Sequence, residues 1–109
     1  MVALINDQNN GYDADLWDEV LATIEDRVLE IEDLIDVSRD SVMQEQAMAE
    51  LKRVVHSLKG LCQAYGIADM ADACHAMEDR LENWAEIERP DLRVFITRLQ
   101  QMFEDQLQR

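Results

Sequence analysis

The residues best suited to chemistry in this chain form the run His56-Ser57-Leu58-Lys59-Gly60. An imidazole nitrogen is a nucleophile, and a lysine ammonium holds phosphate oxygens as a point charge. Lys59 follows His56 by three residues, so the two neighbour each other on a helix surface. This combination is typical of a histidine that carries a phosphoryl group.

Gly60 is the second unusual residue of this run, because the surrounding apolar spacing is helical. A glycine inside a helix costs about 0.5–1 kcal/mol relative to alanine. Helical side chains lean toward the N-terminus, so a larger residue at position 60 would stand over the imidazole of His56. Glycine leaves the ring open to a partner.

On a helical wheel His56 lies opposite the apolar stripe of its helix, with Lys52, Lys59 and Gln63 on the same outer side. An exposed histidine on an arbitrary helix usually has no function. The neighbouring glycine and lysine favour a functional one here, with Lys52, Arg53, Gly60 and Gln63 as the surface that a partner would contact.

The charge pattern supports this interpretation. The chain has 109 residues and a net charge of −14, which argues against nucleic acid as a partner because phosphate neutralisation needs a basic surface. Residues 12–50 are strongly acidic, whereas residues 51–68 contain no acidic residue at all. The acid-free window surrounds His56, where a phosphoryl group would need it.

Four apolar stripes with helical spacing position these residues. The expected helices are about 14–36 with Asp13 or Asp15 as N-cap, a second from a Ser41/Gln44 capping box to about Tyr65, a third from about Asp69 that buries Met70, Cys74, Met77, Leu81 and Trp84, and a fourth after Pro90-Asp91. Short links predict an all-α, antiparallel up-and-down four-helix bundle over 13–109, with His56 on the second long helix. Residues 1–12 are expected to be a flexible lead-in.

The rest of the sequence predicts a domain without a membrane segment, a disulfide or a bound group. No apolar run is long enough for a membrane span and no secretory signal is visible, so we expect a cytoplasmic monomer that binds no membrane. Cys62 and Cys74 fall on apolar faces and are expected to be buried, reduced thiols. Most of the six methionines are expected in the core. We expect no cofactor and no metal.

The third expected helix is predicted to place a carboxylate next to His56. If the chain reverses at Gly66, His56 lies about 15 Å before the turn, level with residues near 76 on the returning helix. His75, Glu78 and Glu82 form one outer stripe there. A Glu78 carboxylate within reach of His56 would fix the tautomer of the ring and leave the other nitrogen as the nucleophile.

The pattern His56-x-x-Lys59-Gly60, followed by Gly66, Cys74 and Glu78, resembles the histidine-containing phosphotransfer (HPt) domain. The resemblance covers roughly 14–107. It implies a helical bundle in which His56 is phosphorylated in two-component signalling, Lys59 and Glu78 assist, and Gly60 clears the docking surface. A histidine kinase domain would be the donor and a response-regulator receiver domain the acceptor.

Within that family, Arg53, Ser57, His75 and Met77-Glu78 look most like the N-terminal phosphotransfer domain of CheA-type chemotaxis kinases. This likeness implies that His75 joins a hydrogen-bond network with Glu78. The run Leu61-Cys62-Gln63-Ala64-Tyr65 departs from the small, glycine-containing run common in those kinases, which leaves a kinase domain and a free-standing relay protein as alternatives.

Two other functions compete. The acidic surface suits a passive helical adaptor in which His56 never carries phosphate. A hydrolase with a metal on His75, Glu78 and Glu82 is a weaker alternative. A kinase in its own right is not expected, because the sequence has no glycine-rich loop and no paired metal carboxylates for ATP.

Overall fold

The computed structural model describes residues 14–39 and 42–108. They form four α-helices and one short 3₁₀ helix: α1 (Ala14–Val37), α2 (Gln44–Ala64), α3 (Ala68–Leu81), η1 (Trp84–Glu86) and α4 (Arg89–Leu107). The described part of the chain contains no strand. The predicted all-α fold class is confirmed.

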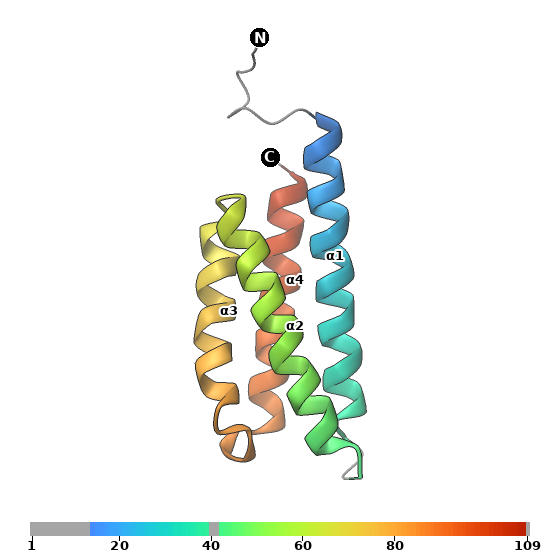
Figure 1. Ribbon diagram of the computed structural model, residues 1–109, viewed down its shortest axis with the longest axis vertical. Coiled ribbons are helices and arrows are strands. Elements are labelled where there is room, and N and C mark those ends of the chain that lie inside the picture. Colours follow the sequence, from blue (N-terminus) through green and yellow to red (C-terminus); the bar gives the residue numbers. More distant parts are fainter. Residues whose placement is uncertain (1–13, 40–41, 109) are drawn as a thin grey trace.

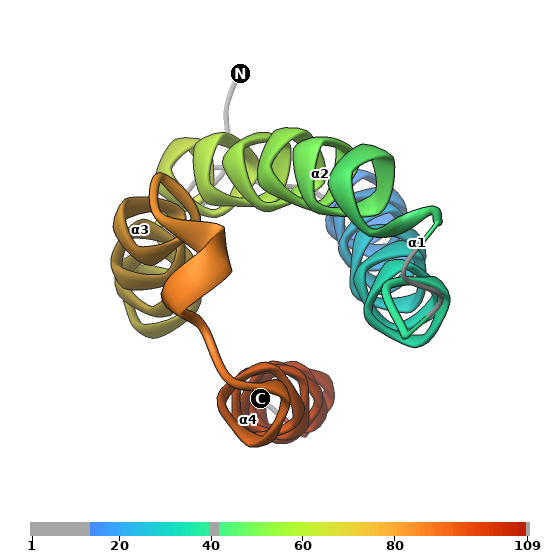
Figure 2. The same ribbon diagram turned by 90° about the horizontal axis from the view of Figure 1, so that it is seen from below.

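The helices alternate in direction and follow one another around a ring. α1 and α3 run one way, and α2 and α4 run the other way (Figure 1). Viewed along the bundle, the order around the ring is α1, α2, α3, α4 (Figure 2), and each helix packs against its neighbours in that order. This is the up-and-down bundle expected when short links join consecutive helices. α2 therefore lies between α1 and α3.

The core lies along the axis of the bundle, where the apolar stripes meet. Each helix contributes residues that are almost wholly removed from water, among them Ile24, Ile31, Ile35, Leu51, Leu58, Met70, Ile96 and Leu99. These positions recur at the three- and four-residue spacing that faces one side of a helix. Burial of a Leu or Ile side chain contributes about 1.5–3 kcal/mol, so this core sets the orientation of the outward residues.

The helix starts differ in detail from the sequence prediction. α2 begins at Gln44 with Met43 as its N-cap and no side-chain cap hydrogen bond, so the helix starts later than the predicted Ser41 cap. Ser41 lies outside the described residues, as do Asp13 and the expected lead-in. Asp15 lies in the first turn of α1 rather than at its cap, where its charge favours the positive end of the helix dipole.

The end of the third helix is also shorter than predicted. α3 stops at Leu81, and Trp84 lies on the separate turn η1, where it is only partly buried. The helical spacing of Trp84 coincided with that of α3, but Asn83 takes a non-helical conformation and breaks the helix before it. α4 then begins at Arg89, followed by a proline at the position where its missing N–H costs nothing.

Two arginines of α4 fasten the bundle at the end where α1 stops. Arg89 donates hydrogen bonds to the carbonyl of Ile35 at 3.3 Å and to Ser38 Oγ at 3.4 Å. Arg93 forms an ion pair with Asp36 at 3.2 Å. A cation at the carboxyl end of a helix is favourable because the last carbonyls of the helix are unpaired.

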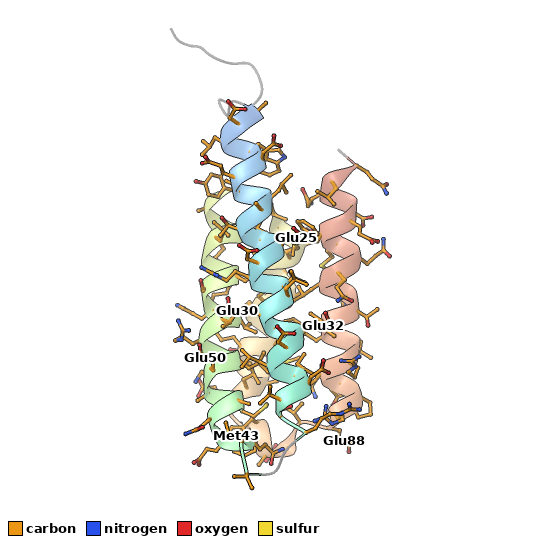
Figure 3. The ribbon with its side chains drawn as sticks, turned by 90° about the vertical axis from the view of Figure 1, so that its right-hand side faces the viewer. Glu25, Glu30, Glu32, Met43, Glu50 and Glu88 are labelled. Carbon is orange, nitrogen blue, oxygen red and sulfur yellow. The ribbon has the colours of Figure 1, made fainter. Side chains whose placement is uncertain are left out.

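The acidic residues concentrate on α1. Figure 3 views the molecule from this side, with Glu30 at the edge toward α2, near Glu50, and Glu25 and Glu32 toward α4. This face is separate from the side of the bundle where α2 meets α3. Over the described ranges, the helices do not include one that is both long and apolar enough to span a membrane.

Candidate functional site

α2 presents His56 to solvent. The side chain of His56 is 67% exposed, while its neighbours Val55 and Leu58 are fully buried. The buried stripe of α2 locks the helix against α1 and α3, and the opposite face points outward. The position of His56 is therefore set by the packing of residues that take no part in chemistry.

Glu78 on α3 contacts the imidazole of His56. The ring Nδ1 and Glu78 Oε2 are hydrogen-bonded. The pKa of Glu78 lies below its ordinary value of 4.5, first because of the hydrogen bond from Lys59 and then because of that from His56. An ionised carboxylate can only accept, so Nδ1 carries the proton and donates it. In the neutral ring, Nε2 then holds the free lone pair.

Lys59 binds the other oxygen of the same carboxylate. Its Nζ lies 2.5 Å from Glu78 Oε1, and both side chains are only 16% exposed. The sequence suggested that Lys59 would be open to phosphate on the outer face of α2. In the structure its ammonium is instead largely buried and bound to the same Glu78 carboxylate that is hydrogen-bonded to His56.

Gly60 and Gly66 have different structural roles. A Cβ added to Gly60 would meet nothing within 4 Å, so no packing requirement excludes a side chain there. Gly66, in the turn between α2 and α3, has a φ of +75. This is the predicted left-handed conformation, which only glycine adopts at low cost. The packing of the domain therefore does not explain why position 60 is a glycine.

The other predicted contact residues lie around His56 on the outer face of α2. Lys52 forms an ion pair with Glu82 of α3 at 2.6 Å, and Arg53 pairs with Glu50 one turn earlier. Gln63 is exposed. The Lys52–Glu82 pair was not predicted, although its signal was present: Lys52 precedes His56 by four residues, and Glu82 follows Glu78 by four.

His75 contacts Asp79 and not Glu78. It is exposed, and its Nε2 lies 3.8 Å from Asp79 Oδ2, one turn along α3. The side chains at 75 and 78 are about 60° apart around a helix, and Glu78 is largely buried beside α2 while His75 faces solvent. Nowhere in 14–39 and 42–108 do three His, Cys, Asp or Glu side chains gather to hold a metal ion.

Both cysteines are free and buried, as predicted. Burial raises the pKa of the Cys62 thiol to about 11 and that of Cys74 to about 12. The methionines Met48, Met70 and Met77 lie in the core, but Met43 is exposed at the start of α2. The buried thiols and thioethers belong to the apolar core of the bundle.

The lowered pKa of Glu78 predicts a pH dependence of stability. The folded chain releases the Glu78 proton more readily than the unfolded chain, so Glu78 contributes stability above about pH 4.5. That contribution is lost as the pH falls through the folded-state pKa. We expect urea midpoints of the wild type to drop more between pH 6 and about pH 3 than those of Glu78→Gln. Equal drops would contradict the ion-pair assignment.

Comparisons with known proteins identify the family of this chain. Residues 15–109 match the family described as Hpt domain. A stretch of 60 residues, 55% of the chain, is 40% identical to the chemotaxis protein CheA of Halobacterium salinarum, of which it covers 8%. No solved structure matches. The chain belongs to the Hpt domain family, whose members carry a phosphoryl group in two-component signalling.

Proposed function

We propose that His56 accepts a phosphoryl group on Nε2 from a histidine kinase domain and passes it to an aspartate of a response-regulator receiver domain. The hydrogen bond from His56 Nδ1 to Glu78 is the observation that carries this proposal. It leaves Nε2 as the nucleophile of an exposed imidazole, on a helix that carries no side chain at Gly60.

The chemistry needs little from this chain. The Nε2 lone pair attacks the γ-phosphorus of ATP held by the kinase, and ADP leaves with the electrons of the broken P–O bond. Nδ1 keeps its proton, and the ionised Glu78 stabilises the positive charge that develops on the ring. In the second transfer the receiver carboxylate attacks phosphorus, and the N–P electron pair returns to Nε2. Positioning and charge stabilisation are the main requirements of such a transfer.

The match to CheA suggests which pathway the carrier serves. We place the chain in chemotaxis signalling, acting as a monomer in the cytoplasm, with a CheA-type kinase as donor. Both arrangements of the domain, within a kinase chain or as a separate relay protein, use the same His56 surface. Lys52, Arg53, Gly60 and Gln63 surround His56 and are the contact residues proposed for both partners.

Phosphotransfer in two stages tests this function. The chain is incubated with a CheA-type kinase domain and ATP, and the label is checked for the acid lability and alkali stability of phosphohistidine. Labelled chain is then mixed with a receiver domain and Mg²⁺. We expect the label to move to the receiver. A chain that never takes up label would contradict the proposal.

The acidic face of α1 favours one other function, a passive adaptor that recognises a basic partner. Such an adaptor needs no free Nε2. It predicts partner binding that falls with added salt and that is unaffected by replacement of His56. Replacement of His56 therefore distinguishes the two functions, because it abolishes phosphotransfer by a carrier but leaves partner binding by an adaptor unchanged.

Substitutions at Gly60 should separate stability from transfer. Because an added Cβ meets nothing within 4 Å, we expect Gly60→Ala and Gly60→Gln each to stabilise the bundle by about 0.5–1 kcal/mol. The glutamine side chain covers the turn that carries His56, so we expect slower transfer to the receiver for glutamine and near wild-type transfer for alanine. Urea unfolding and transfer kinetics measure the two effects.

Gly60→Ala is the matched control in this pair, because it removes the glycine without covering the ring. If both variants are more stable and both transfer at the wild-type rate, Gly60 has no docking role. If alanine slows transfer as much as glutamine, the backbone freedom at this position matters instead of the open surface.

A further inference from the structure

Every cation of α2 is already paired with a carboxylate in the unphosphorylated chain. The three pairs are Lys52 with Glu82, Arg53 with Glu50, and Lys59 with Glu78. A phosphoryl group on His56 would therefore bring two negative charges to a helix face without an unpaired cation. Any direct ionic partner that the phosphoryl oxygens gain from α2 must therefore be one of these three paired cations.

Lys52 is the cation best placed to supply that partner. It precedes His56 by one turn, and helical side chains lean toward the N-terminus, so the His56 ring stands over the turn that carries Lys52. Lys59 lies on the other side of the ring, and its ammonium is held by the same carboxylate that binds Nδ1. Release of Lys59 would disturb the orientation of the nucleophile itself.

Of the two pairs that join α2 to α3, the Lys52–Glu82 pair is also the easier one to open. Its side chains are 39% and 62% exposed, against 16% for both members of the Lys59–Glu78 pair. Exposed ion pairs contribute little to stability because water competes for both charges. A phosphoryl group offers an ammonium more charge and more acceptor oxygens than a carboxylate does, so exchange of partner favours the phosphorylated histidine.

We propose that Lys52 leaves Glu82 when His56 is phosphorylated and binds the phosphoryl oxygens, with Glu82 as the carboxylate that competes for it. This inference rests on the proposed function and adds to it a positioning residue and a built-in competitor. Lys52 would hold the phosphoryl group from the turn of α2 before His56, whereas Lys59 lies on the turn after it. Glu82 would limit the strength of that contact and so keep the group transferable.

The test uses phosphoramidate as a small phosphodonor, so it needs no kinase. Its P–N bond breaks, ammonia leaves, and a bond forms between phosphorus and His56 Nε2. Work in a His75→Gln background leaves one phosphohistidine to observe. The ³¹P shift is followed against pH, because an ammonium at the phosphoryl oxygens lowers the pKa of that group. The variants are Lys52→Gln, Glu82→Gln, the two combined, and Asp36→Asn.

We expect Glu82→Gln to lower the phosphoryl pKa by roughly 0.5 and Lys52→Gln to raise it. Most of the fall caused by Glu82→Gln should vanish when Lys52 is also replaced, because the released ammonium is then absent. Asp36→Asn removes the same charge from a cross-helix pair on another side of the bundle and should leave the phosphoryl pKa unchanged.

Three results would overturn the inference. The first is an unchanged phosphoryl pKa in Glu82→Gln. The second is a fall of equal size with and without Lys52, which would mean that loss of the Glu82 charge acts through space alone. The third is an equal fall in Asp36→Asn. The proposed function is judged separately by labelling from a kinase and ATP, so failure of one proposal does not hide the fate of the other.

Discussion

We expect the His56→Gln variant to take up no phosphoryl group from a CheA-type kinase domain, while His75→Gln is labelled like the wild type. Glutamine has no nucleophilic nitrogen at the position of Nε2, so labelling should fall to background, at least about 100-fold. His75 shares its described ion pair with Asp79 and not with Glu78, so its loss leaves the His56–Glu78 contact intact. Acid-labile incorporation of phosphate measures both variants.

The two histidines control for each other, because each substitution removes one imidazole from an exposed helix surface. Undiminished labelling of His56→Gln would reject His56 as the acceptor. Loss of label only in His75→Gln would assign the reaction to α3 instead. Equal partial loss in both would show that neither residue alone is the site, which also contradicts the proposal.

The second large effect is expected at Glu78. Glu78→Gln keeps an oxygen that can accept the hydrogen bond from His56 Nδ1 but loses the negative charge that stabilises the ring as it reacts. Partners that orient a metal-binding histidine typically contribute about 10- to 100-fold, and we expect a fall of similar size in the rate of phosphorylation of His56. The initial rate at a fixed kinase concentration is the measurement.

Asp79→Asn is the matched control for Glu78→Gln. It removes the same charge from the next residue of α3, where Asp79 is exposed beside His75. A rate loss in Asp79→Asn as large as in Glu78→Gln would attribute the effect to the overall charge of α3. Urea unfolding of both variants shows whether the loss of the Lys59–Glu78 pair has altered the fold.

The fold was predictable because the helices are long and their apolar stripes are continuous. The α1 stripe predicted its helix to within one residue at the carboxyl end. The errors in the predicted helix ends arose where a short sequence pattern fitted more than one local structure. Ser41 and Gln44 matched a capping box by type, yet Met43 takes the cap position. Trp84 matched the period of α3, yet the backbone at Asn83 had already left the helix.

The site was predictable where it depended on register between two helices. The chain reverses at Gly66, so a residue some ten positions before the turn lies at the same height as one some ten positions after it. This relation predicted that Glu78 lies beside His56. The direction of Lys59 toward α3 was not predictable, because it depends on the rotation of α2 about its axis. The contact of His75 with Asp79 is an i,i+4 pair within α3, a spacing that the sequence contains but that was not used. The roles of all these residues in transfer remain predictions.

The burial of Cys62 and Cys74 makes this domain convenient for site-specific spectroscopy. Thiol reagents attack the thiolate, and a thiol with a pKa of about 11 is deprotonated in only about one molecule in 10⁴ at pH 7. A cysteine introduced on the exposed face of α4, such as Arg98→Cys, would react far faster than either native thiol. A fluorophore or spin label there would report distances to a docked partner with the native sulfur atoms left in place.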